Sequence, residues 1–339
     1  MASSSPAPES LPADIDATKV ASVQRRLLDW FDANGRDLPW RRTRDPYCIL
    51  ISEVMLQQTQ VDRVTPYYHA FLERFPTLVA LAEAPTAEVI TAWAGLGYNR
   101  RAVNLQRTAR AILDQHDGRF PETIEELRRL PGIGPYTAGA IACFAFEQPS
   151  AFLDTNMRRV LHRLYFGSDV PVPVVNEAAV LRIAIASVPP DNGWSWNQAL
   201  IEFGALQCTA RRPACVVCPL QSSCAAYPTV QSALAALPRG TRLVSDAPFT
   251  SSNRYYRGRV VDVLRELAST GAERSIEIRK LGATIRDGFS DDDVPWLYGL
   301  VTDLARDGLA VAAEESPAYD AGTDRPEDGT MPTLRVRLP

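Results

Sequence analysis

The sequence predicts a mainly helical protein with a small α+β unit near its C-terminal end, and three observations support that prediction. Most of residues 18–227 divides into short helical segments bounded by Pro, Gly or Asp, as helices joined by tight turns are. Little of this stretch shows the alternation of apolar and polar residues that is typical of strands. Further along the chain, helical segments are followed by two short strand-like runs, and this order suggests a winged-helix-like unit.

The helical part contains a clear start signal. Asp45 and Pro46 form a cap followed by proline at the first helical position, and they open an apolar stretch that continues through Gln58. Further helices are expected at residues 63–74, 86–94, 100–115, 123–129, 136–146, 155–165, 176–187 and 195–206.

The C-terminal elements follow a turn-rich segment. Residues 228–253 are mixed in composition and are interpreted as a linker. A helix is then expected at 254–270, a short strand and helix within 276–286, and a helix at 291–307 that ends at Gly308. The runs LAVAAEE and TLRVRL flank a loop rich in Asp, Gly, Thr and Pro, and they predict a terminal β-hairpin. The expected parts are a disordered N-terminus (1–17), a helical domain (18–227), the linker (228–253) and a winged-helix-like domain (254–339).

Size and charge restrict the class of protein. With 339 residues, of which 46% are hydrophobic, the chain is long enough for a globular fold with a buried core. Its first residues lack a basic start with an apolar run, and no later stretch approaches the ~18 apolar residues of a membrane span, so a cytoplasmic protein is expected. The charge is uneven: residues 1–245 contain 24 Lys and Arg against 23 Asp and Glu, whereas residues 246–339 contain 12 against 17. A nearly neutral body can still present a basic face to phosphates, because such binding depends on local clustering.

Four of the six cysteines lie close together, with the spacing C-x6-C-x2-C-x5-C: Cys208, Cys215, Cys218 and Cys224. In a reducing compartment this clustering favours metal ligation over disulfides. A zinc ribbon normally has two CxxC pairs and this segment has one, whereas four thiolates on a compact loop suit a [4Fe-4S] cluster. Bound zinc and incidental cysteines are the alternatives.

Two glycines and an aspartate form a second pattern. In LPGIGPYTAGAI, Gly132 and Gly134 predict a tight turn between two helices, where the missing side chains let a phosphate approach backbone N–H groups. Further on, FLDTNMRRV places Asp154 at the start of a helix. Alone, Asp154 would be interpreted as an ordinary N-cap. The helix N–H groups would also keep its carboxylate ionised, as suits a group that faces a developing cation.

A second carboxyl group lies in ILISEVMLQQTQV. Apolar side chains occur around the whole circumference of a helix from Ile49 to Leu56, so the helix should be buried and Glu53 with it. A buried glutamate tends to keep its proton, as a general acid requires. A glutamate on an exposed stripe is the alternative. Two carboxyl groups with separated pKa values are the recurrent apparatus for cleaving a glycosidic bond.

These motifs resemble a known family. The cysteine spacing is similar to that of the endonuclease III and adenine glycosylase branch of the helix-hairpin-helix DNA glycosylases, and SEVMLQQT resembles the signature of its adenine-specific members. The resemblance covers about residues 20–227 and implies a helix-hairpin-helix fold with the cluster loop at 208–224. It further implies a monofunctional enzyme of base excision repair that acts on adenine opposite 8-oxoguanine or guanine in double-stranded DNA. We expect a monomer associated with the nucleoid.

The resemblance also implies catalytic roles. Glu53 would protonate N7 of an adenine flipped out of the duplex, and Asp154, assisted by Asn156, would stabilise the cationic sugar. Endonuclease III has a lysine after the hairpin, which forms a Schiff base and leads to strand cleavage. This chain has Tyr136 there, so no strand cleavage is expected, and Tyr136 should hydrogen-bond the catalytic carboxylates or else pack against the hairpin.

The remaining implied site residues bind DNA. In RDLPWRR, the side chains of Arg36, Trp40 and Arg41 would line the base pocket together with Leu56. Other residues would occupy the gap left in the duplex, namely Gln57, Gln58 and, in GLGYNRR, Tyr98. Without their motifs, Trp40 and Tyr98 could equally be core aromatics. Backbone groups at Gly132 and Gly134 and the side chains of Arg211 and Arg212 would contact phosphates.

The chain departs from the family after the linker. Adenine glycosylases of this kind usually end in a Nudix-like domain that recognises 8-oxoguanine, and the C-terminal residues of this chain are too few and wrongly patterned for one. Their excess of acidic residues disfavours phosphate binding unless Arg254, Arg257 and Arg259 form a local patch. A thymine glycosylase of the same fold that acts on G:T mispairs is an alternative, as is a non-catalytic iron–sulfur DNA-binding regulator.

Overall fold

The structure is a computed structural model that describes residues 16–237, 249–270, 274–315 and 333–339. The predicted disorder of residues 1–17 falls almost entirely outside the described residues, whose first member, Asp16, already caps a helix. The chain divides into two compact units. The first unit comprises residues 1–53 and 120–241, and the second comprises residues 54–119 and 242–339. None of the described helices is long and apolar enough to cross a membrane.

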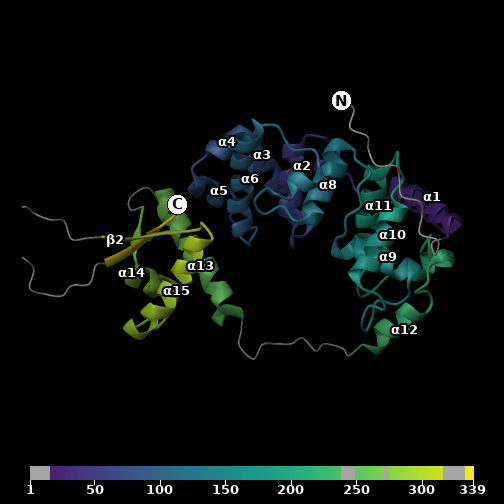
Figure 1. Ribbon diagram of the computed structural model, residues 1–339. Helices are drawn as coiled ribbons and strands as arrows, with labels where there is room; N and C mark the ends of the chain where they lie inside the picture. Colours follow the sequence, from purple (N-terminus) through teal and green to yellow (C-terminus); the bar gives the residue numbers. More distant parts are fainter. Residues whose placement is uncertain (1–15, 238–248, 271–273, 316–332) are drawn as a thin grey trace, which may run out of the picture. The chain divides into compact units, whose positions relative to one another are not determined.

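The first unit is built from helices (Figure 1). Helix α11 packs against both α1 and α9. Gly204 permits the close approach of α11 to α9, because a Cβ atom at this position would lie 2.7 Å from Cβ of Asn156. The helices of this unit are α1 (Ala17–Asn34), most of α2 (Pro46–Leu56), α7 (Ile124–Leu127), α8 (Pro135–Phe146), α9 (Thr155–Tyr165), α10 (Glu177–Ser187), α11 (Gly193–Leu206) and α12 (Thr229–Ala236), with short 3-10 turns η1 (Pro39–Arg41), η2 (Cys215–Val217) and η3 (Gln221–Ser223).

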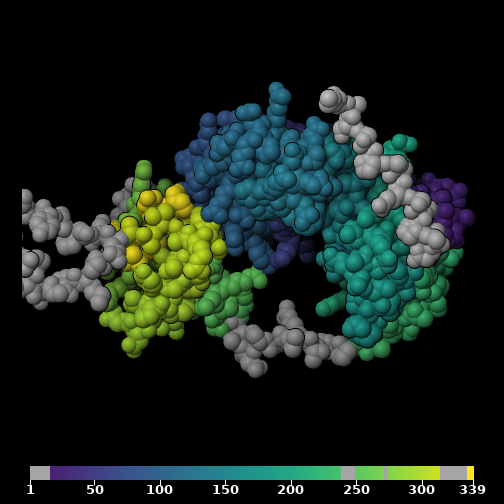
Figure 2. Space-filling view, in the orientation of Figure 1, coloured from purple at the N-terminus to yellow at the C-terminus, as the bar shows by residue number. Residues whose placement is uncertain are grey.

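The second unit combines a helical segment from the middle of the chain with the C-terminal residues. Ile90 and Val103 from the middle of the chain share one hydrophobic core with Val260, Leu264 and Leu300 from the C-terminal part. In Figure 2 the yellow-green C-terminal part of the chain lies against the blue middle segment. The helices are α3 (Val61–Arg74), α4 (Leu78–Glu83), α5 (Thr86–Ala92), α6 (Arg100–His116), α13 (Asn253–Thr270), α14 (Ile278–Ile285) and α15 (Val294–Arg306), with 3-10 turns η4 (Phe249–Ser251) and η5 (Asp291–Asp293).

A small antiparallel sheet completes the second unit. Its strands are β1 (Ile276–Glu277), β2 (Val311–Glu315) and β3 (Thr333–Arg337), in the order β1-β3-β2. Val311 pairs with Arg337 and Ala313 with Arg335, so the two predicted terminal runs do form a β-hairpin. Three helices with a three-stranded sheet give the predicted winged-helix-like unit, and the mainly helical fold class is confirmed.

Helix α1 was not among the expected helices, and two shorter helices were not expected from the sequence either. Helix α4 has six residues, and its start is fixed by Thr77, whose side chain accepts a hydrogen bond from the N–H of Ala80. Helix α12 lies within residues 228–253, which were interpreted as a linker, and only Val230 of this helix is buried. Both helices are too short for apolar periodicity to reveal them. The compact units also differ from the predicted domains, because residues 54–119 group with the C-terminal residues.

Candidate active site

Glu53 is almost completely buried in α2, with 5% of its surface exposed. This burial raises the pKa of Glu53 to about 7, although the hydroxyl of Tyr136, which donates a hydrogen bond to the carboxyl group, acts in the opposite direction. Among the described residues, Oε2 of Glu53 has no hydrogen-bond partner. A buried carboxyl oxygen without a partner is costly, and it marks the place where a proton or a bound group can be accommodated.

Tyr136 lies in the first turn of α8, directly after the glycine turn. Its ring meets the ring of Phe152 edge to face, with centroids 5.4 Å apart, and its hydroxyl bonds Glu53. Burial and the nearby carboxylates of Glu53 and Asp154 raise the pKa of Tyr136, so its hydroxyl stays protonated. Tyr136 therefore both packs beside the hairpin and bonds a carboxyl group, so the two interpretations left open by the sequence hold together.

Asp154 is the N-cap of α9. Its Oδ1 accepts a hydrogen bond of 2.6 Å from the N–H of Met157, and its Oδ2 accepts one of 3.1 Å from the side chain of Asn156. Burial raises the pKa of Asp154 above its usual value, and these hydrogen bonds, which stabilise the ionised form, offset that rise only in part. The capping interpretation of Asp154 is therefore confirmed, whereas its ionised state stays a prediction.

The side chains of Glu53, Tyr136 and Asp154 belong to α2, to α8 and to the N-cap of α9, and they influence one another's pKa values. The negative charge of Asp154 contributes to raising the pKa values of both Glu53 and Tyr136. The structure thus brings together the two predicted carboxyl groups, which are a hundred residues apart in the sequence. It gives them different partners: Glu53 accepts a bond from one phenol, whereas Asp154 accepts bonds from a backbone N–H and an amide.

The glycine turn has the geometry that a close approach requires. Gly132 has a φ of 76°, a left-handed conformation that favours glycine. Gly134 is the N-cap of α8 and receives no side-chain cap, and a Cβ atom there would have no heavy atom within 4 Å. The backbone at the start of α8 is therefore open on this side, as an anion-binding helix start requires.

Arg36 and Arg41 both bind a buried residue that the sequence analysis did not select, Glu202. Nε of Arg36 lies 2.7 Å from Oε1 of Glu202, and Nη2 of Arg41 lies 2.9 Å from Oε2. Arg41 also donates to Gln198, at 2.8 Å. Although Glu202 is fully buried, these arginines lower its pKa to about 2. Trp40, between the two arginines in sequence, is 6% exposed and is a core aromatic.

Leu56, Gln57, Gln58 and Tyr98 belong to the second unit. Gln58 and Tyr98 have φ values of 57° and 48°, so each occupies a left-handed position in a turn. Tyr98 is 45% exposed and is therefore not a core residue, whereas Leu56 is half-buried at the end of α2.

A buried arginine that the sequence analysis also missed holds both turns. Nη1 of Arg101 donates to the carbonyls of Val54, Met55 and Gln57, at 2.6 to 2.9 Å. Its Nη2 donates at 3.1 to 3.2 Å to the Thr59 hydroxyl and to the carbonyls of Leu96 and Gly97. Burial lowers the pKa of Arg101 to about 10. One side chain thus fixes the turns that present Gln58 and Tyr98, although no local pattern distinguishes it from its neighbour Arg100.

The four clustered cysteines line one cavity, whose wall also includes Arg163, Leu164 and Phe203. In the described part of the chain, these cysteines form no disulfide. Nη1 of Arg163 lies 3.7 Å from Sγ of Cys208. Four thiols around one largely apolar cavity, with a cation beside them, match the donor set of an iron–sulfur cluster, whose thiolate ligands carry negative charge.

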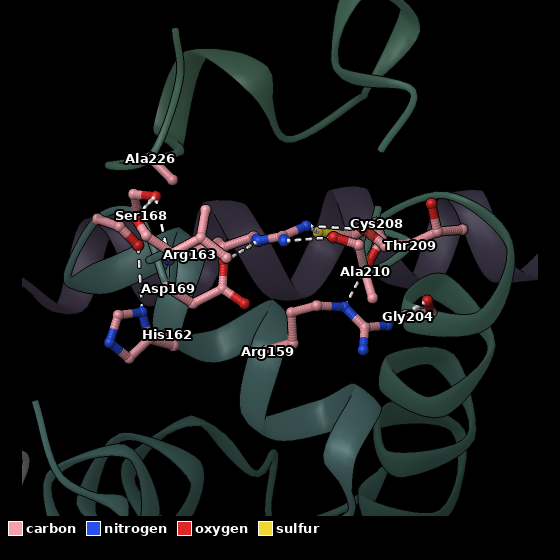
Figure 3. Close-up of polar contacts among 12 residues, drawn as sticks. Arg159, His162, Arg163, Ser168, Asp169, Gly204, Cys208, Thr209, Ala210 and Ala226 are labelled. Atoms are coloured by element: carbon pink, nitrogen blue, oxygen red, sulfur yellow. Dashed lines mark hydrogen bonds and ion pairs between the residues drawn. The ribbon is translucent and has the colours of Figure 1, made fainter. Parts of the chain in front are cut away.

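Two arginines of α9 anchor the cluster loop (Figure 3). Arg163, whose side chain is 2% exposed, forms an ion pair with Asp169 at 2.6 Å and donates to the carbonyls of Thr209 and Ala210. Arg159 donates to the carbonyl of Cys208, at 2.8 Å, and to the side chain of Asn156, also at 2.8 Å. Hydrogen bonds therefore run from Asp154 through Asn156 and Arg159 to the backbone of a cluster ligand.

Arg211 and Arg212 follow this anchored segment and are exposed. On one side, Arg163 holds the carbonyl of Ala210. On the other side, the N–H of Ala214 donates to the carbonyl of Gln207, at 3.0 Å, and the Gln207 side chain donates to the carbonyl of Ala214, at 2.7 Å. Because both ends of the short segment are fixed, the two guanidinium groups are confined to its exposed side.

Two family models match the chain. Residues 51–181 match the HhH-GPD superfamily of base excision DNA repair proteins, and residues 208–224 match the iron–sulfur binding domain of endonuclease III. The second match covers all four clustered cysteines, so the prediction of a [4Fe-4S] cluster is confirmed.

Similar proteins agree with these matches. An adenine DNA glycosylase of Mycolicibacterium smegmatis is 39% identical over 291 residues, which is 85% of this chain and 95% of that protein. The mouse adenine DNA glycosylase is 42% identical over 66% of this chain, but the match spans only 45% of the mouse protein. Among solved structures, a thermostable thymine-DNA glycosylase is 31% identical, with a TM-score of 0.58 over 64% of this chain and 99% of that one. Endonuclease III in a trapped covalent intermediate with DNA is 25% identical, with a TM-score of 0.53 over 62% of this chain and 96% of that one.

Proposed function

The chain belongs to the adenine DNA glycosylases of the HhH-GPD superfamily, which act in base excision repair, and from this premise we propose how it acts and on which base pair. The substrate is double-stranded DNA in which adenine is mispaired with 8-oxoguanine or guanine. The reaction is hydrolysis of the bond between adenine and its sugar. The observation that carries the proposal is the meeting of Glu53, Tyr136 and Asp154, because it places two carboxyl groups with different hydrogen-bond partners at the same site.

Glu53 is the general acid. With a pKa of about 7, a substantial fraction of Glu53 is protonated at neutral pH, and its unpartnered Oε2 can hold the proton that is passed to N7 of the flipped adenine. Protonation makes the base a better leaving group. Flipping is required because N7 and the sugar carbon cannot both be approached by these side chains within the base stack.

Asp154 stabilises the positive charge that develops on the sugar as the bond to adenine breaks. The hydrogen bonds from Met157 and Asn156 favour the ionised carboxylate, which is the form that can face a cation or bond to it briefly before water attacks. Asn156 is a positioning residue, because its amide binds Oδ2 of Asp154 while its own oxygen is held by Arg159.

Tyr136 orients the proton on Glu53 and forms no covalent bond to DNA. A phenol has no amine with which to form an imine at the sugar, so release of the base is not followed by enzyme-catalysed strand cleavage. The enzyme is therefore a monofunctional glycosylase, in contrast to a glycosylase with lysine at this position.

The base pocket and the DNA contacts complete the proposed site. Glu202 holds Arg36 and Arg41 in place, so that the segment carrying these arginines forms a rigid wall of the adenine pocket. Gln57, Gln58 and Tyr98 occupy the gap left by the flipped base. The backbone at Gly132 and Gly134 and the side chains of Arg211 and Arg212 bind phosphates. The four cysteines would hold the iron–sulfur cluster, and this ligation would help to keep the loop of Arg211 and Arg212 folded.

Single-turnover release of base tests the proposal. Duplexes containing A:8-oxoG, A:G, A:C and T:G are compared, each with and without alkali. We expect release of adenine opposite 8-oxoguanine and guanine, with strand breaks only after alkali. The likeness to a thymine-DNA glycosylase makes T:G the critical comparison, and faster release of thymine than of adenine would overturn the assignment. Strand breaks without alkali would contradict the role given to Tyr136.

A matched variant tests the role of Asp154. Asp154→Asn keeps an oxygen that can cap α9 but removes the negative charge. We expect the variant to lose base release while it still binds the duplex. If it released adenine at the parental rate, the proposed mechanism would be abandoned.

A further inference from the structure

We propose that the C-terminal segment contributes a second DNA-binding surface, in which Arg254 and Arg259 of α13 bind backbone phosphates of the duplex beside Tyr98. This proposal rests on the proposed function, in which Tyr98 enters the gap in the duplex. It gives a role to a segment for which the sequence resemblance offers none. We call the surface the Arg254 groove; it is lined by the turn at Gln58–Gln60, the turn at Gly95–Asn99 and the first half of α13.

The Arg254 groove is large and basic. Its volume is about 1200 Å³, and six arginines but only two aspartates are among the described residues that line it. The C-terminal residues have an excess of acidic side chains, yet their arginines at the start of α13 gather on the groove. Phosphate binding depends on such local clustering and not on the net charge of a segment.

Of the three arginines that α13 contributes to the groove, two are available to a ligand. Arg257 is already paired with Asp307, at 2.6 Å, and Arg100 also faces Asp307, at 3.4 Å. Arg254 and Arg259 are exposed, and no carboxylate among the described residues pairs with either of them. The sequence suggested a patch of three arginines, and in the described residues only Arg254 and Arg259 of these three have no carboxylate partner.

Exposed aromatic rings lie beside the unpaired charge. The guanidinium of Arg254 lies 4.5 Å from the ring centroid of Tyr98 and 5.9 Å from that of Phe249. Tyr98 is 45% exposed and Phe249 is 62% exposed. Stacking on these rings restricts the guanidinium while leaving its N–H groups free to bind phosphate oxygens in a bidentate manner. Arginine interleaved with exposed aromatic rings is typical of surfaces that bind nucleic acids.

The groove is held rigidly within the second unit. Arg265 of α13 donates to the carbonyl of Ile90, at 3.1 Å, and to the side-chain oxygen of Asn99, at 2.9 Å. Asn99 directly follows Tyr98, and Arg101 fixes the same turn from the other side. Helix α13 and the Tyr98 turn are thus joined by hydrogen bonds as well as by a common core, so Arg254 and Tyr98 present one preformed surface.

Salt-dependent binding measurements test the proposal. Arg254→Ala and Arg259→Ala are each made in a Glu53→Gln background, and affinity for an undamaged duplex and for an A:8-oxoG duplex is measured by fluorescence anisotropy over a series of salt concentrations. We expect each substitution to weaken binding to both duplexes about three- to ten-fold and to reduce the slope of log K against log salt by about one. Arg254→Lys, which keeps the charge, should retain most of the slope.

Arg279→Ala is the matched control, because Arg279 is also exposed on the second unit but pairs with Asp291 and does not line the groove. We expect its slope to equal that of the background. If Arg254→Ala and Arg259→Ala behaved like this control, or if their loss were confined to the A:8-oxoG duplex, the phosphate-binding surface would be refuted. Adenine release by the parent protein from the same duplex tests the proposed function separately, so the two can fail independently.

Discussion

Two buried glutamates in this protein have the same kind of sequence context, but their pKa values are shifted in opposite directions. Glu53 lies in α2 and Glu202 in α11, each as the one acidic residue of a largely apolar helix, with 5% and 0% of its surface exposed. The pKa of Glu53 is raised to about 7, whereas that of Glu202 is lowered to about 2. Burial acts on both in the same direction, so burial does not explain the difference.

The difference comes from the partners. Glu202 accepts hydrogen bonds from two arginines, whose charges more than offset the cost of removing a carboxylate from water. Glu53 accepts a hydrogen bond from one neutral phenol and lies near the negative charge of Asp154. Whether the pKa of a buried glutamate is raised or lowered therefore depends on residues that are distant in the sequence.

Removing the proton donor should have the largest effect. Glu53→Gln keeps the shape of the side chain but cannot protonate adenine, so we expect single-turnover release from an A:8-oxoG duplex to fall about a thousand-fold. Duplex affinity, measured in parallel, should be retained. Release at a rate within a few-fold of the parent would show that Glu53 is as inert chemically as Glu202.

Removing the structural anion should damage stability. Glu202→Gln leaves Arg36 and Arg41 without a counter-charge, and Arg41 is buried, so we expect a loss of about 3 kcal/mol in the free energy of unfolding. Chemical denaturation of the cluster-containing protein measures it. Glu177→Gln is the control, because Glu177 pairs with Arg158 on the surface, where little stability is at stake. Equal effects of the two substitutions would contradict the structural role of Glu202.

The pH dependence of base release should report the pKa of Glu53. Only the protonated form donates, so above a pKa of about 7 the single-turnover rate should fall about ten-fold for each pH unit. Glu202 stays ionised throughout this range and should contribute nothing to the profile. Rates measured from pH 6 to 9 test this expectation, and a flat profile above pH 7 would argue against Glu53 as the acid.

Stability should depend on pH in opposite ways at the two sites, because the pKa of Glu53 is raised and that of Glu202 is lowered. The folded pKa of Glu53 exceeds its ordinary value, so its ionisation costs stability as pH rises from about 4.5 to about 7. Glu53→Gln should therefore stabilise the protein at pH 8 by about 3 kcal/mol and leave stability at pH 4 almost unchanged. The folded pKa of Glu202 is depressed, so its contribution is present above about 4.5 and is lost as pH falls toward 2. Denaturation of the parent and Glu53→Gln proteins at pH 4 and pH 8 measures the first effect, and a Glu53→Gln variant that is less stable at pH 8 would refute it.

The sequence predicted those features that depend on local pattern. The apolar circumference of residues 49–56 predicted the burial of Glu53, and the position of Asp154 predicted both its cap and its hydrogen bonds to the helix start. The cysteine spacing predicted the iron–sulfur domain. Each of these signals lies within about a dozen residues of chain, where periodicity and spacing carry information.

The features that the sequence did not reveal depend on contacts between distant segments. Arg36 and Glu202 are separated by 166 positions, and no pattern near either residue indicates the pair. Arg101 is one of two adjacent arginines, and its role becomes visible only when the carbonyls of two separate turns converge on it. The Arg254 groove likewise requires knowing that α13 shares a core with α5 and α6.

That shared core limits how the chain can be shortened. A stop codon in the linker would leave Ile90 and Val103 without the apolar side chains that cover them, on the very helices that flank the Tyr98 turn. We expect such a truncated protein to expose an apolar surface and to aggregate, so that it would not persist as a smaller folded enzyme. In the sequence the last ninety or so residues look like a separate addition to the catalytic part. In the structure they complete the hydrophobic core around Ile90 and Val103, so the second unit requires them in order to stay folded.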